Sequence, residues 1–246
     1  MTDYLIFRLY GPIASWGDIA VGEVRPSHTH PSKSAVLGMV AAALRINRDQ
    51  EEKHSELAAA YGLAVQVDSM GVPLVDYHTV QVPPSGSGRN RRVFATRREE
   101  LRTLPRDELK TILSRRDYRM DALAKVALWA RTVTPPYSLE EIQGALERPG
   151  YVLYLGRKSC PLALPLEAQL VTASSIREAF IAARFAEFEA LRYLTISVTP
   201  DLYWESGTEA GLAAHHTFER RDVPLSRRRW QFDARREHHA PMDKES

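Results

Sequence analysis

Two stretches, residues 4–10 (YLIFRLY) and residues 32–46 (SKSAVLGMVAAALRI), decide the fold of this chain of 246 residues. The first is a short apolar run with branched and aromatic side chains, which predicts a buried strand. In the second, Ser32 is a suitable N-cap, and apolar residues fall on one face of a helix: Val36, Leu37, Val40, Ala41 and Leu44. The segment between them, residues 13–31, shows no periodicity, so we expect a structured loop.

Predicted strands and helices continue to alternate through the first two thirds of the chain. We expect a helix over 50–61 that ends at Gly62, a strand over 63–68, a strand over 121–132 whose alanines also permit a helix, a capped helix over 138–147, and strands around 151–155 and 166–171. The order strand, helix, strand, strand, helix, strand is the split β-α-β arrangement of ferredoxin-like domains. The sequence therefore predicts an α+β fold with a ferredoxin-like, RRM-like core, although a fold alone does not define a function.

The pattern of residues after 174 predicts one more helix, additional strands and an unstructured C-terminal tail. Residues 175–191 have the pattern of an amphipathic helix. Strand-like pieces at 192–198, 215–221 and 228–236 predict additional C-terminal β-strands. We expect the body to comprise residues 1–76 and 120–236, and residues 237–246 to form a flexible tail.

Residues 77–119 differ from the rest of the chain in composition. Apolar side chains become rare, Pro83-Pro84 and the Gly-Ser-Gly sequence at 86–88 break the chain, and arginine dominates. A segment of this length without a core face of its own does not pack as part of a body. We therefore predict a protruding, arginine-rich lobe inserted into the body.

Arginine clusters distinguish a chain whose net charge is close to neutral. With 33 Lys and Arg against 31 Asp and Glu the net charge is +2, yet residues 89–98 contain five arginines and no acid. A second cluster lies within residues 220–236. Because guanidinium groups fork onto phosphates and stack on bases, the clusters indicate a polyanion bound along a track. A solvated, arginine-rich surface encoded by a GC-rich genome explains the same pattern equally well.

Composition excludes several classes of protein. The mean hydropathy is -0.33, and the absence of an 18-residue apolar run excludes a membrane-spanning chain. The single cysteine, Cys160, excludes a disulfide framework and a Cys-rich zinc site. The chain has no phosphate-binding loop, HExxH helix or nucleophile elbow. We expect no metal, no cofactor and no membrane partner, and, without a signal pattern at the start, a cytoplasmic protein.

The segment YVLYLGRKSCP combines groups that single-stranded RNA binding requires. Tyr154 offers a ring for stacking, Gly156 permits close approach of a backbone, and Arg157, Lys158 and Ser159 present phosphate donors. The same residues also suit a core strand that ends in a charged turn.

Histidines are candidates for acid–base catalysis of metal-free RNA cleavage. His78 stands beside Asp76 and Tyr77 at the base of the arginine-rich lobe, where a structural hydrogen-bonding role is the more common one. The other candidates are His28, His30 and the pairs at 215–216 and 238–239. Neighbouring histidines on a strand point to opposite faces, so these pairs are weak indications of a metal site.

Five segments in order carry a resemblance to a known family: YLIFRLYGPIASWG at 4–17, RPSHTHPSKSAVLGMVAAALRI at 25–46, DYHTV at 76–80, DYRMDALAKVALW at 117–129 and, most specifically, YLGRKSCPLALP at 154–165. Together they resemble the fifth Cas family of the RAMP superfamily, in the form found in type I-E CRISPR Cascade. The resemblance implies a ferredoxin-like core with a protruding thumb, here residues 77–119.

The resemblance also implies a function and partners. A member of this family is expected to be a non-catalytic subunit of an antiviral ribonucleoprotein complex. There it binds the 5′ handle of the mature CRISPR RNA and caps the backbone that other protein subunits form. The implied partners are CasC-type backbone subunits and a CasA-type large subunit, with target DNA near the thumb. A separate CasE subunit is expected to cut the precursor RNA.

Candidate RNA contacts follow from the residues and the resemblance together. Ser32, Lys33 and Ser34 open the first helix, where free backbone N–H groups favour a phosphate. Gly38 permits a backbone or sugar to approach the same helix, although it also eases helix packing. The remaining candidates are Trp16, for which burial is an open alternative, Arg25, His78, Arg89, Arg91, Arg92, Arg97 and Arg98.

Two alternatives to the non-catalytic RNA-binding function stay open. Relatives in type I-C systems are metal-independent endoribonucleases, so a repeat-cutting site built on His78 with Tyr77 or Lys33 as helper is the second hypothesis. A duplex-DNA binder that uses both arginine clusters is the third. Cleavage of repeat RNA in EDTA, or duplex affinity of the isolated chain, separates these alternatives from RNA binding.

Overall fold

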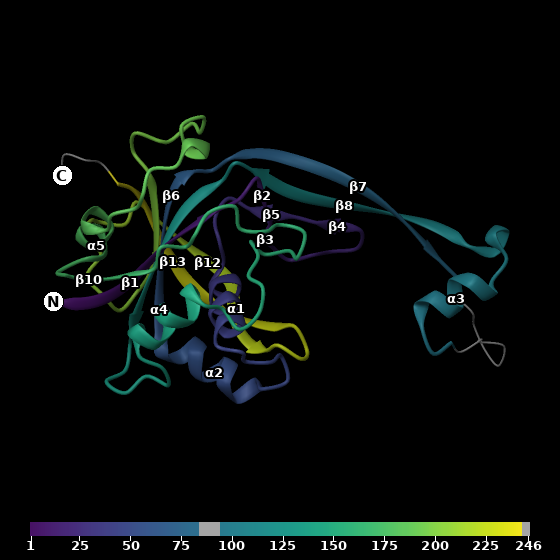
Figure 1. Cartoon of the computed structure of the whole chain (residues 1–246), viewed down its shortest axis with the longest axis horizontal. Coiled ribbons are helices and arrows are strands. Elements are labelled where there is room, and N and C mark those ends of the chain that lie inside the picture. Colours follow the sequence, from purple (N-terminus) through teal and green to yellow (C-terminus); the bar gives the residue numbers. More distant parts are fainter. Residues whose placement is uncertain (84–93, 243–246) are drawn as a thin grey trace.

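Strand β1 (Thr2–Tyr10) organises the main sheet of the computed structural model, which describes residues 1–83 and 94–242 (Figure 1). It pairs antiparallel with β9 (Leu123–Ala130) on one side and with β10 (Gln169–Ala173) on the other. Strand β9 also pairs antiparallel with β6 (Tyr61–Ser69). All of β6, and β1 from Tyr4 onward, is buried, because other layers cover the sheet on both faces.

Helices connect these strands in the predicted order. The connecting helices are α1 (Lys33–Ala43) and α2 (Glu51–Ala60) between β1 and β6, and α4 (Leu139–Glu147) between β9 and β10. The predicted caps are confirmed: the Ser32 side chain accepts from the backbone N–H of Ala35, and Ser138 forms a capping box with Glu141. The strand, helix, strand, strand, helix, strand connection is that of ferredoxin-like domains.

Two apolar layers enclose the main sheet. Leu5, Phe7 and Leu9 of β1 pack in the cluster that contains α1, α2 and α4. Tyr4 and Ile6 face the opposite cluster, to which α5 (Ile176–Ala182) contributes. Because successive side chains of a strand alternate between faces, one strand serves both layers.

The predicted helix over 175–191 is wrong in its length. Helix α5 ends at Ala182, and the chain continues extended to the short 3-10 helix η2 (Glu189–Leu191). Tertiary contacts explain the early end: the Arg184 backbone N–H donates to Gln169 Oε1 at 2.9 Å, and the rings of Phe185 and Phe188 lie beside the guanidinium group of Arg8. In a continued helix the Arg184 N–H would donate to the carbonyl of Phe180, four residues earlier, so its bond to Gln169 ends the helix.

Other predicted strands differ from the observed structure. Residues 192–198 form no strand, because the segment crosses the end of β6, where the Ser197 N–H donates to the Asp68 carbonyl at 2.8 Å. Residues 151–155 form a loop closed by a hydrogen bond from the Leu155 N–H to the Cys160 carbonyl. The strand predicted over 166–171 is observed as β10, further along the chain.

The structure contains additional C-terminal strands, as predicted, and these extend the main sheet beyond β6. In order from β6 they are β11 (Asp201–Glu205), β13 (Gln231–Pro241) and β12 (His216–Ser226). The prediction of a flexible tail over 237–246 is wrong for residues 237–242. Strand β13 pairs with β12 as far as His239 and with β11 as far as Pro241, and the Met242 N–H donates to the Pro200 carbonyl at 2.8 Å. Residues 243–246 lie outside the described part of the chain.

A long two-stranded hairpin projects from the body (Figure 1). It consists of β7 (Val72–Val82) and β8 (Lys110–Met120), and helix α3 (Arg97–Thr103) and the 3-10 helix η1 (Arg106–Glu108) lie near its far end. The short strands at its base are β2 (Ile13–Ala14) and β4 (Val24–Arg25), which pair with β8, and β3 (Trp16–Gly17), which pairs with β5 (Ser27–His28). The described part of the predicted lobe, residues 77–83 and 94–119, belongs to the hairpin and its far end, and the hairpin begins before residue 77. A division into body and thumb domains stays a prediction.

Candidate nucleic-acid interface

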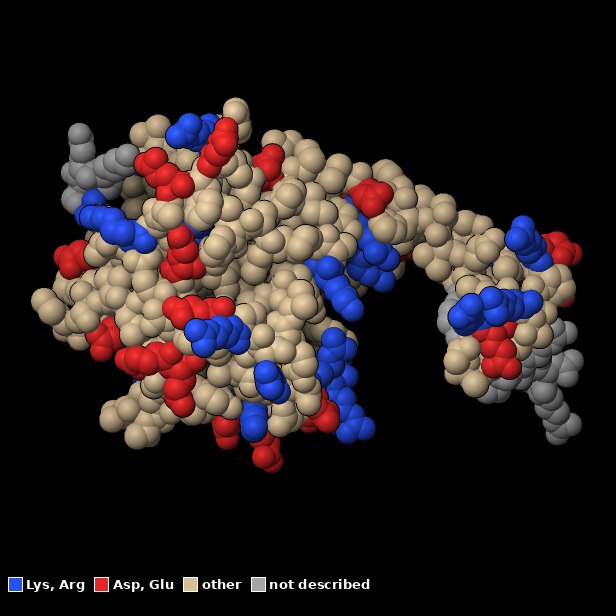
Figure 2. All heavy atoms as spheres, in the orientation of Figure 1, with Lys and Arg blue, Asp and Glu red and all other residues tan. Residues whose placement is uncertain are grey.

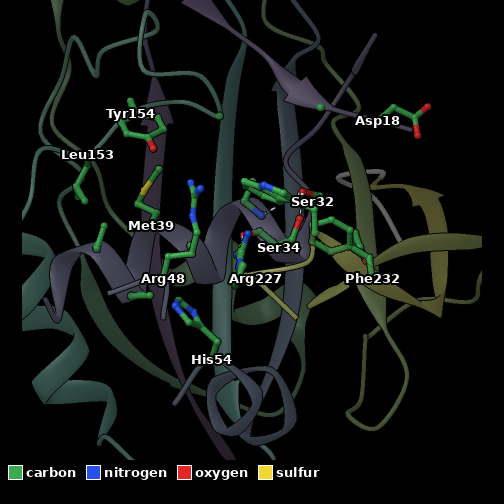
Figure 3. A pocket seen from close by; sticks show the side chains of 18 of the residues that line it. Asp18, Ser32, Ser34, Met39, Arg48, His54, Leu153, Tyr154, Arg227 and Phe232 are labelled. Atoms are coloured by element: carbon green, nitrogen blue, oxygen red, sulfur yellow. Dashed lines mark hydrogen bonds between the residues drawn. The ribbon is translucent and has the colours of Figure 1, made fainter. Parts of the chain in front are cut away.

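A groove of about 880 Å³ runs along the outer side of helix α1. The segments that form it are the loop over 151–156, the β12–β13 turn taken with the start of β13 (residues 227–232), the loop over 46–48 and the loop over 17–20. Figure 3 shows side chains from these segments around α1. Four separate parts of the chain thus meet at one surface.

Three arginines of this groove lack acidic partners among the described residues, whereas Arg220, which also lines it, pairs with Asp222 and Glu237. Arg48, Arg221 and Arg227 line it, and within the described part of the chain no carboxylate lies within ion-pair distance of any of them. The half-exposed Asp18 also lines the groove, but Figure 3 shows its side chain pointing away from the arginines. On the face shown in Figure 2, Lys and Arg gather along the edge of the body that faces the hairpin, while Asp and Glu dominate the opposite side. The groove therefore carries a positive charge suited to an anionic ligand.

Arg227 is the most enclosed of these arginines. Its guanidinium group donates to the Ser34 carbonyl and lies against Gly38, where a side chain on the helix would come within 3.0 Å of it. Burial, with a smaller contribution from the positive charge of Arg48, lowers the pKa of Arg227 to about 10. Gly38 was predicted to admit a backbone or sugar. It admits an arginine side chain instead.

Aromatic rings line both walls of the groove. Tyr151 and Tyr154 come from the loop over 151–156, and Trp230 and Phe232 come from the β12–β13 turn. Tyr154 is 40% exposed and Trp230 is 56% exposed, so their rings are accessible to a ligand. The guanidinium group of Arg48 lies 4.7 Å from the centre of the Trp230 ring.

The start of helix α1 does not offer the predicted phosphate site. The backbone N–H of Lys33 donates to Asp222 Oδ2 at 2.8 Å, so a carboxylate of the protein already occupies the anion-binding position. The Lys33 side chain is buried and pairs with Glu205 at 3.0 Å, and burial lowers its pKa. Ser32 and Ser34 still line the groove. Lys33 is therefore a structural residue, and its prediction as an RNA contact is wrong.

The arginines near the C-terminus divide into two groups. Arg220 and Arg235 are buried in an ion-pair network, with Arg220 at 3.3 Å from Glu237 and Arg235 at 2.6 Å from both Asp222 and Glu237. This network joins β12 to β13 and leaves Arg221 and Arg227 to face the groove. Among the described residues, no group of His, Cys, Asp and Glu side chains could hold a metal ion.

The loop residues 154–159 have separate roles. Tyr154 and Gly156 line the groove. The guanidinium group of Arg157 instead donates to the carbonyls of Asp117 and Arg25 at 3.2 and 2.9 Å, away from the groove lining. Lys158 and Ser159 are exposed but do not line the groove. The structure thus brings only part of this predicted motif to the candidate interface.

The remaining predicted residues lie elsewhere. Trp16 is 3% exposed and belongs to the core, so its prediction as an RNA contact is wrong. Arg25 is exposed at the base of the hairpin, and Tyr77 and His78 lie on β7, where the His78 ring is beside Asp76. Arg98 lies on α3. Outside the described residues lie Arg89, Arg91, Arg92 and the side chain of Arg97.

Several groove residues are absent from the predicted set, namely Arg48, Arg221, Arg227, Tyr151, Trp230 and Phe232. The sequence RRRWQF at 227–232 contains a usable signal, since aromatic residues among arginines are typical of single-strand binding. No local pattern identifies Arg48, which reaches the groove only because the connection between α1 and α2 turns beside Trp230.

The fold and the groove together define an α+β protein with a ferredoxin-like sheet, a projecting hairpin and an arginine- and aromatic-lined surface. Comparison with known families identifies the class: a model described as CRISPR-associated protein (Cas_Cas5) matches residues 4–237. The chain belongs to this family.

Individual relatives agree with this assignment. The chain is 32% identical over 246 residues to the "CRISPR system Cascade subunit CasD" of Escherichia coli (strain K12), covering 96% of this chain and 94% of the relative. In fold it resembles a chain of a "CRISPR RNA-guided surveillance complex", with 24% identity, a TM-score of 0.64 and coverage of 97% and 90% of the two chains. It also resembles a "Crystal structure of Cas protein", with 25% identity, a TM-score of 0.60 and coverage of 98% and 96%. In the described part of the chain, no helix is both long and apolar enough to cross a membrane.

Proposed function

We propose that this protein is a non-catalytic subunit of a type I-E Cascade complex and binds the 5′ handle of the mature CRISPR RNA in the groove. Membership of the Cas5 family and similarity over nearly the whole chain to a Cascade subunit support the assignment to such a complex. The complex would serve antiviral defence.

The main support for RNA binding is that arginines without acidic partners and accessible aromatic rings lie in the same groove. Arg48 and Arg227 supply charge without an acidic partner among the described residues, and Tyr154 and Trp230 supply ring faces in the same groove. Single-stranded RNA presents both complementary features, a phosphate backbone and unstacked bases. A DNA duplex keeps its bases stacked and would leave the rings without partners.

Affinity for handle RNA tests this proposal directly. We expect the full-length protein to bind a fluorescent handle RNA more tightly than duplex DNA, and Tyr154→Ala to weaken binding by about 1–3 kcal/mol through loss of one stacked base. Tyr193→Ala is the matched control, because Tyr193 is 83% exposed and does not line the groove. Equal effects of the two substitutions, or a preference for duplex DNA, would contradict RNA binding in the groove.

Two features support a non-catalytic role over the endoribonuclease alternative. Lys33 is buried against Glu205 and is unsuited to assist His78, and Tyr77 lies with His78 on the hairpin rather than in the groove. We expect purified protein to leave repeat RNA intact in EDTA. Specific cleavage that His78→Ala abolishes would establish the endoribonuclease instead.

We also propose CasC-type backbone subunits and a CasA-type large subunit as partners, with target DNA near the hairpin. Apolar side chains exposed on the two strands of the hairpin support a protein partner there: Val72, Val75, Tyr77, Val80, Ile112 and Leu113. Copurification of these subunits with the tagged protein is the expected result.

A further inference from the structure

We propose that Arg48 and Arg227 together hold one backbone phosphate of the bound RNA, and that the base next to this phosphate stacks on Tyr154. This inference rests on the proposed RNA-binding function and assigns a particular subsite within the groove. Figure 3 shows Arg48 and Arg227 side by side along α1, with Tyr154 beyond them on the loop over 151–156.

Arg227 lacks a partner for its charge. The side chain is held in place by its hydrogen bond to the Ser34 carbonyl and by contact with Gly38. Its Nε atom is buried without a hydrogen-bond partner, and no carboxylate of the described residues lies within ion-pair distance. A partly buried cation with a buried, unpartnered Nε atom is costly unless an anion from outside completes its surroundings. An incoming phosphate would supply that anion.

Arg48 places a second positive charge at the same position. Its guanidinium group lies 4.7 Å from the centre of the Trp230 ring, and Figure 3 shows it next to Arg227. Its positive charge also contributes to the lowered pKa of Arg227. Like charges at short range repel unless a counter-ion lies between them. The Nε2 atom of nearby His54 is hydrogen-bonded to the Asn47 carbonyl at 3.0 Å. Arg48 and Arg227 are therefore the principal anion-binding groups of this part of the groove.

The geometry favours a phosphodiester group of single-stranded RNA as the ligand. Two planar guanidinium groups provide forked donors for phosphate oxygens. The half-exposed ring of Tyr154 lines the same groove, and Figure 3 shows it beyond the two arginines, so a phosphate at the arginines would bring an adjacent base toward the ring. An inorganic anion would use the arginines but not the ring.

Salt dependence provides a quantitative test. We expect the double variant Arg48→Gln/Arg227→Gln to reduce the slope of log K against log salt by about 0.7, which corresponds to loss of one phosphate on a single strand. Two arginines on different phosphates would reduce the slope by about 1.4 instead, and this result would overturn the shared subsite. Arg229→Gln is the matched control, because Arg229 lies on the same turn but does not line the groove. Unfolding curves of each variant confirm that it is folded.

Replacing single phosphates of the RNA by neutral methylphosphonates identifies the contact. We expect one linkage at which the replacement weakens binding to the wild-type protein and has no effect on binding to the double variant. Equal losses in both proteins at every linkage would overturn the subsite. If Tyr154→Ala still weakens RNA binding in that case, the proposed function stands without the subsite. If the wild-type protein does not prefer handle RNA to duplex DNA, the proposed function fails as well.

Discussion

At the scale of single residues, two glycines differ in what a side chain would meet. Gly156 has a φ of +82°, and a Cβ atom there would overlap the carbonyl oxygen of Ser15. Gly144 lies within helix α4, and a Cβ atom there would meet nothing within 4 Å. Gly156 therefore allows the loop over 151–156 to approach the chain before Trp16, which positions Tyr154 in the groove.

We expect Gly156→Ala and Gly144→Ala to change stability in opposite directions. Backbone strain and overlap with Ser15 lower the free energy of unfolding of Gly156→Ala by about 1–3 kcal/mol. Alanine in place of a helical glycine raises it by about 0.5–1 kcal/mol in Gly144→Ala. Urea unfolding of the full-length variants measures both values. Comparable stabilities of the two variants would show that the loop relaxes without cost.

At the scale of elements, Arg157 connects the groove loop to the base of the hairpin. Its guanidinium group donates to the carbonyls of Asp117 on β8 and Arg25 on β4, and lies 4.6 Å from the centre of the Tyr118 ring. These contacts join segments far apart in the sequence. Arg157 thus holds the hairpin against the body, and its role in RNA binding stays a prediction.

Removal of Arg157 is expected to loosen this connection. Arg157→Ala loses two hydrogen bonds and a cation–π contact in a partly exposed position, which lowers the free energy of unfolding by about 1–2 kcal/mol. Hydrogen exchange at β4 and the base of β8 measures the local effect. The exposed neighbour Lys158 provides the control Lys158→Ala, and equal exchange in the two variants would argue against a structural role for Arg157.

At the scale of the whole molecule, a buried ionic network joins the N-terminal and C-terminal parts of the chain. His30 contacts Glu237 at 3.0 Å and receives a hydrogen bond from Arg220, while Arg235 binds both Asp222 and Glu237. Burial, the largest effect, lowers the pKa of His30 to about 4. Hydrogen bonding and ion pairing lower the pKa of Glu237 despite its burial.

Both shifts make the folded protein less stable in acid. His30 is neutral in the folded state down to about pH 4, whereas its pKa is 6.5 when unfolded, so unfolding takes up a proton between these values. Stability contributed by this group is present above pH 6.5 and is lost as the pH falls toward 4. Glu237 adds a further loss below its unfolded pKa of 4.5.

We therefore expect the free energy of unfolding to fall between pH 7 and pH 4.5, with His30 contributing about 1.4 kcal/mol per pH unit at most. His28 and His54, whose pKa values are also lowered by burial, contribute in the same direction. Denaturant unfolding at a series of pH values measures the slope, and His30→Gln reduces it, whereas His215→Gln on the exposed surface does not. A slope that His30→Gln leaves unchanged would show that His30 is not protonated on unfolding.

The sequence by itself determined those helices and strands that depend on patterns of neighbouring residues. The apolar run of β1, the N-caps at Ser32 and Ser138 and the order of helices and strands depend on neighbouring residues, and the structure confirms them. The low apolar content of residues 77–119 likewise marks a segment without a core face of its own, and its division from the body as a domain stays a prediction. Family membership, carried by motifs such as YLGRKSCPLALP, is also a property of sequence alone.

Only the tertiary structure decided which charged residues remain available to a ligand. Lys33 and Arg227 look alike as isolated cations, but Lys33 meets Glu205 across 172 residues of chain, while Arg227 meets only the Ser34 carbonyl. Helix α5 ends early for the same reason, because the Arg184 N–H bonds to the distant Gln169 side chain and not to the carbonyl four residues before it. Ion pairing and burial depend on distance in space, and local patterns along the chain carry no information about partners so distant in sequence.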